Sequence, residues 1–124
     1  MIPKFRCFDK DAKTMHEVVA IDFKDWRVYY EAYGLRSYWN KNVVLMQSTG
    51  LYDRHGVEIF QGDVVEIVYD GEPFTGVVVY DLGETDFKAT NNREDYGNNF
   101  QYLTVGESIE VIGDIYQNTE LLEV

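Results

Sequence analysis

The chain has 124 residues, of which 45% are apolar and 15% aromatic, and its formal net charge is −11. A chain of this length and composition can form the core of one ordinary domain, so we expect a single domain over residues 1–124. It has no apolar run near the roughly 20 residues that a membrane helix needs, and its start lacks a signal-peptide pattern. We therefore expect a protein of the bacterial cytoplasm without membrane contact.

The charge is unevenly spread along the chain. Residues 1–47 carry eight Lys and Arg against six Asp and Glu, whereas residues 48–124 carry three against sixteen. Phosphate backbones bind through Lys and Arg, so this acid argues against nucleic-acid binding by the C-terminal portion. It serves either solubility or the docking of a basic partner. As a candidate interaction surface we select Glu84, Asp86, Glu94, Asp95 and Tyr96.

The N-terminal third predicts short strands. Residues 4–8 and 14–23 predict a hairpin joined by a polar, Asp-rich connector. Cys7, the sole cysteine, falls in the alternating pattern of the first strand and is expected to be a packed core thiol. Residues 25–41 contain four tyrosines and two tryptophans, which favour strand and irregular structure, although their spacing also permits a helical turn.

The middle of the chain predicts a strand over residues 42–47 that ends at Ser48-Thr49-Gly50. Asp53 and Gly56 occupy the first and fourth positions of a predicted type I turn. Residues 64–69 and 76–82 then predict the two strands of a hairpin, turned by residues 70–73 and rich in β-branched valine.

The last third continues the pattern. Strands are expected around residues 87–90, 100–105 and 109–116, with a loop over residues 91–99. Gly113 lies inside the last of these strands, where a glycine often marks a bulge or a close approach of another backbone. Asn118 can cap a short C-terminal helical turn.

These elements together predict a mainly β or α+β fold, a small barrel-like domain of short antiparallel strands. Residues 62–79 resemble the KOW-type segment of small SH3-like barrels, which binds RNA where it is basic. Residues 57–88 hold eight acidic side chains and one lysine. We therefore expect the SH3-like shape without the RNA binding.

The order and spacing of three blocks resemble the phage and prophage YopX-like proteins. The blocks are Lys4-Phe5-Arg6 with Phe8-Asp9 and Met15-His16-Glu17-Val18; Leu45-Met46-Gln47, Thr49-Gly50-Leu51, Asp53, Gly56, Glu58-Ile59 and Gly62-Asp63-Val64; and Ile109 to Tyr116 with Asn118 and Glu120-Leu121-Leu122. The resemblance implies a β-rich protein encoded by a phage or prophage that works inside a bacterium. It brings no catalytic residues.

The sequence offers no constellation for catalysis or metal binding. His16 and His55 are the only histidines, and neither has a second His or Cys at ligand spacing. No serine stands in a Gly-x-Ser-x-Gly elbow, and the predicted turn accounts for Asp53 beside His55. We therefore expect no enzyme, no metal and no cofactor.

An aromatic and basic stretch has two interpretations. Trp26, Arg27, Tyr38 and Trp39 could stack bases and hold phosphates. The alternative, which we favour because Asp25 and Glu31 dilute the positive field, places these rings in the core or a subunit interface.

The function that these patterns favour is a non-catalytic module that binds a host or phage protein. The alternatives are a nucleic-acid-binding β-barrel that uses residues 26–41 and an acidic nucleic-acid mimic that inhibits a host protein. A hydrolase with an acidic metal site is a weaker hypothesis. Head-to-tail self-association into a homo-oligomer is left open, because the two ends of the chain differ in charge.

Overall fold

The structure is a computed structural model that describes residues 4–31, 35–39, 42–91, 100–104 and 108–118. Every regular element in these ranges is a β-strand, which confirms the expected mainly β class. Contacts divide the chain into a first unit, Met1–Ser48, and a second unit, Thr49–Val124, which we describe separately. Whether the two fold as one cooperative domain is a thermodynamic question, so the single-domain expectation stays a prediction.

The first unit is an antiparallel sheet in the order β4-β3-β2-β1-β5. Its strands are β1 (Phe5–Asp9), β2 (Thr14–Asp22), β3 (Arg27–Glu31), β4 (Leu35–Trp39) and the beginning of β5 (Val43–Tyr52). The predicted N-terminal hairpin is confirmed, with Cys7 facing His16 in the β1–β2 register. The expected strands within residues 25–41 are also present, as the β3–β4 hairpin.

The core of the first unit is built around four buried residues, Cys7, Val28, Tyr30 and Val43, against which Val18 and Leu45 pack. Cys7 is completely buried, which confirms the predicted core thiol. Burial, followed by the nearby charge of Asp9, raises the pKa of the Cys7 thiol to about 11. The thiol is therefore a packing group at neutral pH.

Strand β5 is longer than the sequence predicted. The expected end at Ser48-Thr49-Gly50 was wrong, because the strand continues to Tyr52. Ser48 N–H donates to the Lys4 carbonyl at 2.8 Å, and Thr49 Oγ1 donates to the Ile59 carbonyl at 2.7 Å. These two partners are remote in sequence, so a local turn signal could not reveal them.

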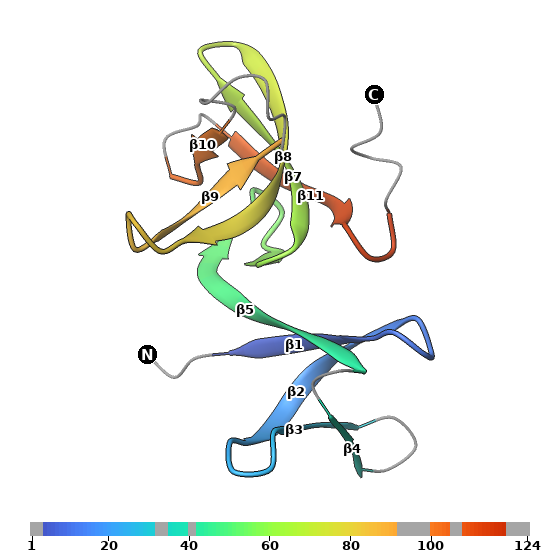
Figure 1. The fold of residues 1–124 in the computed structure, drawn as a ribbon. Helices are drawn as coiled ribbons and strands as arrows, with labels where there is room; N and C mark the ends of the chain where they lie inside the picture. The colour runs from blue at the N-terminus through green and yellow to red at the C-terminus, as the bar shows by residue number, and fades with distance from the viewer. Residues whose placement is uncertain (1–3, 32–34, 40–41, 92–99, 105–107, 119–124) are drawn as a thin grey trace. The chain divides into compact units, whose positions relative to one another are not determined.

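The second unit contains the rest of β5 and six further strands. They are β6 (Glu58–Phe60), β7 (Asp63–Tyr69), β8 (Glu72–Asp81), β9 (Asp86–Thr90), β10 (Phe100–Tyr102) and β11 (Ser108–Asp114). Five of them form a sheet in the order β10-β9-β8-β7-β11, in which β7, β8 and β9 lie side by side (Figure 1). Its core gathers buried residues from distant positions: Ile59, Val65, Ile67, Val78, Ala89 and Leu103.

The β7–β8 turn is tighter than predicted. Tyr69 pairs with Glu72, so Asp70-Gly71 alone forms the turn, and the expected four-residue turn through Pro73 was too long. Both residues have positive φ, 52° and 77°, as a two-residue hairpin turn of type I′ requires. The bulge expected at Gly113 is confirmed by a register shift between Val111 and Gly113.

Two sequence expectations for the second unit stay predictions. The C-terminal helical turn lies outside the described residues, apart from Asn118, whose side-chain oxygen accepts the Asp114 N–H at 3.2 Å. Within residues 62–79 the structure shows the β7–β8 hairpin. A hairpin is common to many β folds, so the SH3-like shape expected for this segment also stays a prediction. In the parts of the chain that the structure describes, no helix is long and apolar enough to cross a membrane.

Candidate interaction surface

The turn between β8 and β9, together with the first residue of β9, carries Glu84 and Asp86, two of the acidic residues that the sequence predicted. Asp81 ends β8 and Asp86 begins β9, opposite it in register. Asp81 Oδ1 accepts the N–H groups of Gly83 and Glu84 at 2.8 and 3.2 Å. These bonds tie the backbone of the turn to its own first residue and so stabilise its conformation.

Two residues of neighbouring strands, Lys88 and Tyr102, bond to carboxylates of this turn. Lys88 Nζ lies 2.5 Å from Asp81 Oδ2, and its hydrogen bond is the main reason why the pKa of Asp81 lies below its usual value. The Tyr102 hydroxyl donates to Glu84 Oε2, and this bond raises the pKa of Tyr102. Asp81 is thus paired with a cation. Glu84 accepts the Tyr102 hydroxyl and Asp86 Oδ1 accepts the Phe87 N–H at 2.8 Å, and both of these residues are exposed.

An apolar side chain stands among these carboxylates. Leu82 is 83% exposed, more than any other large apolar side chain of the described residues. Beneath the turn, the rings of Tyr80 and Phe87 meet edge to face with centroids 5.0 Å apart. We call the group of Asp81, Leu82, Glu84 and Asp86 the acidic tip. An apolar centre with a polar rim is the usual anatomy of a protein interface.

The structure brings together only part of the predicted acidic surface. Glu84 and Asp86 share the acidic tip, whereas Glu94, Asp95 and Tyr96 lie outside the described residues. Sequence reasoning missed Asp81 and Leu82. The available signal was Asp81-Leu82-Gly83 directly after a strand, because an Asp that accepts the N–H two residues on leaves the intervening side chain outside the turn.

Of the aromatic and basic candidates, Trp26 is exposed and Arg27 is half-buried. Trp26 is 60% exposed and adopts a positive φ of 56° in the β2–β3 turn, where Asp22 Oδ1 accepts the N–H groups of Lys24 and Asp25. Arg27 faces Trp39 and Val28 faces Tyr38 in the β3–β4 register. Trp26 thus lies on the surface of the first unit, whereas the neighbouring ring of Tyr30 is buried. The side chains of Tyr38 and Trp39 lie outside the described side chains, so the choice between core, interface and nucleic-acid contact stays a prediction for them.

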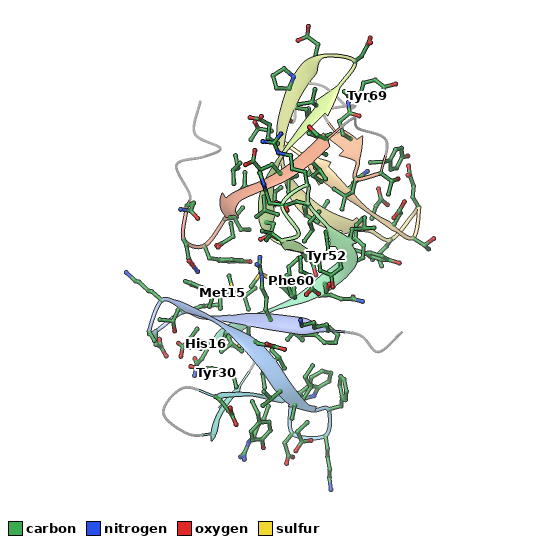
Figure 2. The ribbon with its side chains drawn as sticks, turned by 180° about the vertical axis from the view of Figure 1, so that it is seen from behind. Met15, His16, Tyr30, Tyr52, Phe60 and Tyr69 are labelled. Atoms are coloured by element: carbon green, nitrogen blue, oxygen red, sulfur yellow. The ribbon has the colours of Figure 1, made fainter. Side chains whose placement is uncertain are left out.

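The two histidines contact different residues: His16 contacts Tyr30 and Thr14, and His55 contacts Glu110. The His16 ring stacks on Tyr30 with centroids 3.8 Å apart (Figure 2), and its Nε2 lies 2.6 Å from Thr14 Oγ1. His55 Nε2 lies 3.2 Å from a Glu110 carboxylate oxygen. Among the residues whose positions are described, no three His, Cys, Asp or Glu side chains form a cluster that could hold a metal ion.

Several carboxylates of this acidic chain are internal. Asp9, Asp53, Asp63 and Asp114 are buried. Asp53 Oδ1 accepts the N–H groups of His55 and Val57 at 2.8 and 2.9 Å, which confirms the predicted turn, and its Oδ2 accepts the Val111 N–H at 3.0 Å. Burial by itself would raise the pKa of Asp53, but the three N–H donors outweigh it and lower the pKa.

Asp9 repeats this arrangement in the first unit. Its Oδ1 accepts the N–H groups of Asp11 and Ala12 at 2.9 and 3.1 Å, and its Oδ2 accepts the Tyr30 hydroxyl at 2.7 Å. Burial opposes ionisation of Asp9 as well, yet the hydrogen bonds lower its pKa. The net charge of −11 therefore overstates how acidic the surface is, because part of it stabilises turns.

Comparison with known proteins identifies relatives along nearly the whole chain. The sequence profile of the family described as YopX protein matches residues 4–123. The crystal structure of protein EF1440 from Enterococcus faecalis is 28% identical, with a TM-score of 0.65 and coverage of 99% of each chain. That of protein yopX from Bacillus subtilis is 27% identical, with a TM-score of 0.66, over 97% of this chain and 98% of that one. No curated protein matches the chain.

Proposed function

The chain belongs to the YopX family, and on that premise we propose that it is a non-catalytic module of a phage or prophage that binds another protein in the bacterial cytoplasm. The acidic tip is its binding element. The observation that carries this proposal is Leu82, which is 83% exposed between carboxylates on a turn held by its own hydrogen bonds.

The chemistry of the tip defines the partner. Removing an exposed leucine from water drives association, whereas exposed carboxylates add orientation and speed more than affinity. A fitting partner therefore offers an apolar depression edged by Lys or Arg. Its binding should weaken as salt screens the carboxylates, but should not vanish, because the apolar contact persists.

The arrangement of the titratable groups supports a role without catalysis. The oxygens of Asp9 and Asp53 are occupied by N–H and hydroxyl donors, which lower the pKa of both groups. A general base needs a proton affinity near the working pH and a position beside a substrate. The acceptor oxygens of these two carboxylates instead stabilise turns of the chain.

Capture from the bacterial host with matched variants tests the proposal. The wild type should retain a stoichiometric partner whose yield falls with salt. The triple variant Leu82→Ser, Glu84→Gln, Asp86→Asn should lose it by about tenfold or more. The control, Asp70→Asn with Glu72→Gln, changes the acidic turn of the neighbouring β7–β8 hairpin and should bind normally. Equal retention by the triple variant would contradict the proposal.

A second candidate function rests on the exposed aromatics of the first unit. Phe23 and Trp26, 70% and 60% exposed, flank Lys24 in one turn, as in a platform for single-stranded nucleic acid. Fluorescence titration with an oligonucleotide at low salt tests it. Trp26→Ala should weaken binding by roughly 1–3 kcal/mol, whereas Tyr69→Ala in the second unit should not. Absence of binding at low salt would exclude this candidate.

The acidic-mimic hypothesis receives less support. A nucleic-acid mimic needs its carboxylates on the surface, and within the part of the chain that the structure describes four aspartates are buried. If the partner captured by the acidic tip is a nucleic-acid-binding protein, competition with its nucleic acid should fade steeply with salt. Salt-independent competition would exclude mimicry.

A further inference from the structure

The first unit carries an apolar groove of about 350 Å³. Lys4 lines it together with six apolar residues of β1, β2 and the following turn: Phe5, Val18, Val19, Ala20, Ile21 and Phe23. The register of β2 with β3 shifts between Val18 and Ala20, and such a bulge redirects side chains out of the regular alternation. Val19 is consequently 54% exposed.

The one charged side chain in the lining of the groove, Lys4, has the sign opposite to that of the acidic tip. Lys4 lies in its wall, and Lys24 follows Phe23 in the turn. Of the acidic neighbours, Asp22 uses Oδ1 for two backbone N–H groups of its turn, Glu17 lies 4.0 Å from Lys4, and exposed Asp25 follows Lys24 in the same turn. Residues 1–47 as a whole carry a net charge of +2, against −13 for residues 48–124.

We propose that this groove binds the acidic tip of a second copy of the chain. This inference rests on the proposed function, in which the acidic tip is the binding element, and it adds a second copy of the chain to the partners of that tip. Leu82 would enter the apolar groove while Glu84 and Asp86 approach Lys4 and Lys24 at its margin. Because the two surfaces differ, the contact is heterologous and each copy offers one of each.

Two single variants separate the halves of this contact. Leu82→Ser removes the apolar side chain of the tip, and Val19→Glu places a repelling carboxylate in the groove. Both positions are exposed, at 83% and 54%, so both variants should fold like the wild type, which circular dichroism checks. Val57→Ser, at a position in the second unit that is 47% exposed, is the matched control.

Sedimentation from about 1 µM to about 1 mM protein measures the association. The wild type and the control should associate, less so at high salt. Each single variant should associate roughly 10- to 100-fold more weakly. For Leu82→Ser this is the factor expected for burying one leucine side chain, and for Val19→Glu the carboxylate placed in the apolar groove opposes binding by a similar factor. An equimolar mixture of the two variants should regain association, but only to dimers, because each variant keeps the surface that the other has lost.

A monomeric wild type throughout this range overturns the inference, and so does a variant mixture that stays monomeric while the wild type associates. The outcome for the proposed function is read from a different measurement, the capture of a host partner. If the wild type is monomeric but the triple variant of the tip loses a captured host partner, the tip binds another protein and the self-contact is wrong. If tip variants change neither measurement, both proposals fail.

Discussion

At the scale of single residues, the aspartates have two roles that the sequence does not distinguish. Asp81 and Asp53 both precede a glycine in a turn, yet Asp81 is paired with Lys88 at the surface whereas Asp53 is buried. The turn role of Asp53 was predictable from Asp53 and Gly56. Its bond to Val111, 58 positions away, was not, because only the fold brings β11 to this turn.

Asp53→Asn should destabilise the protein by about 1–3 kcal/mol. The amide keeps one acceptor oxygen, but its NH₂ group would face an N–H donor that Asp53 now satisfies. Urea unfolding measures the loss. Asp70→Asn, at an exposed turn residue with a φ of 52° that asparagine tolerates, should change stability by less than about 0.5 kcal/mol. Equal effects of the two variants would contradict the role of Asp53.

The lowered pKa values of Asp9 and Asp53 predict how stability depends on pH. A carboxyl whose folded-state pKa lies below its unfolded value of about 3.9 contributes stability that is complete above that value and is lost as pH falls through the folded pKa. The free energy of unfolding should therefore be nearly level above about pH 5 and decline below about pH 4. The decline should be shallower in Asp53→Asn; an unchanged slope would contradict the assignment.

At the scale of elements, strand existence was predictable and strand ends were not. The valine-rich strands β7 and β8 follow from β-branched residues between turn signals. The end of β5 and the length of the β7–β8 turn depend on cross-strand partners, such as Glu72 opposite Tyr69. Local composition cannot give such partners.

The close approach of β9 to β8 explains why residue 76 is a glycine. A Cβ at this position of β8 would lie 2.8 Å from the Phe74 ring and 3.0 and 3.1 Å from backbone atoms of Thr90 in β9. Gly76→Ala should therefore destabilise the protein by about 1–3 kcal/mol, because backbone of the adjacent strand cannot move away cheaply.

Thermal unfolding of Gly76→Ala measures this cost against Gly83→Ala as a control. A Cβ at Gly83 would meet a side-chain oxygen of Asp81 at 3.2 Å and no backbone atom of another strand, so the crowding there is milder than at Gly76. Its effect should stay below about 1 kcal/mol. Wild-type stability of Gly76→Ala would show that β8 and β9 pack less tightly than the structure indicates.

At the scale of the whole molecule, the open question is whether the two compact units unfold together. Strand β5 contributes to both, since residues 43–47 pair with β1 and Leu51 packs on the core of the second unit. Loss of either unit would remove the pairing that orders one half of this strand. We therefore expect one cooperative transition.

Two probes test the cooperative transition. The only tryptophans, Trp26 and Trp39, belong to the first unit, so their fluorescence reports on that unit. Far-ultraviolet circular dichroism reports on strands of both units. The two urea midpoints should coincide. A fluorescence transition that precedes or follows the dichroism transition would show two domains in place of the predicted one.

The sequence by itself determined the β class, most strands, the buried thiol, the turn at Asp53 and the family, because these depend on alternation, turn residues and the order of short motifs along the chain. Only the fold shows which acidic residues are internal, where β5 ends, that Leu82 is exposed in the turn that also carries Glu84, and that apolar side chains of β1 and β2 line a groove. The physical reason is that burial and exposure are set by strands that pair across long stretches of chain, and no local pattern contains those pairings.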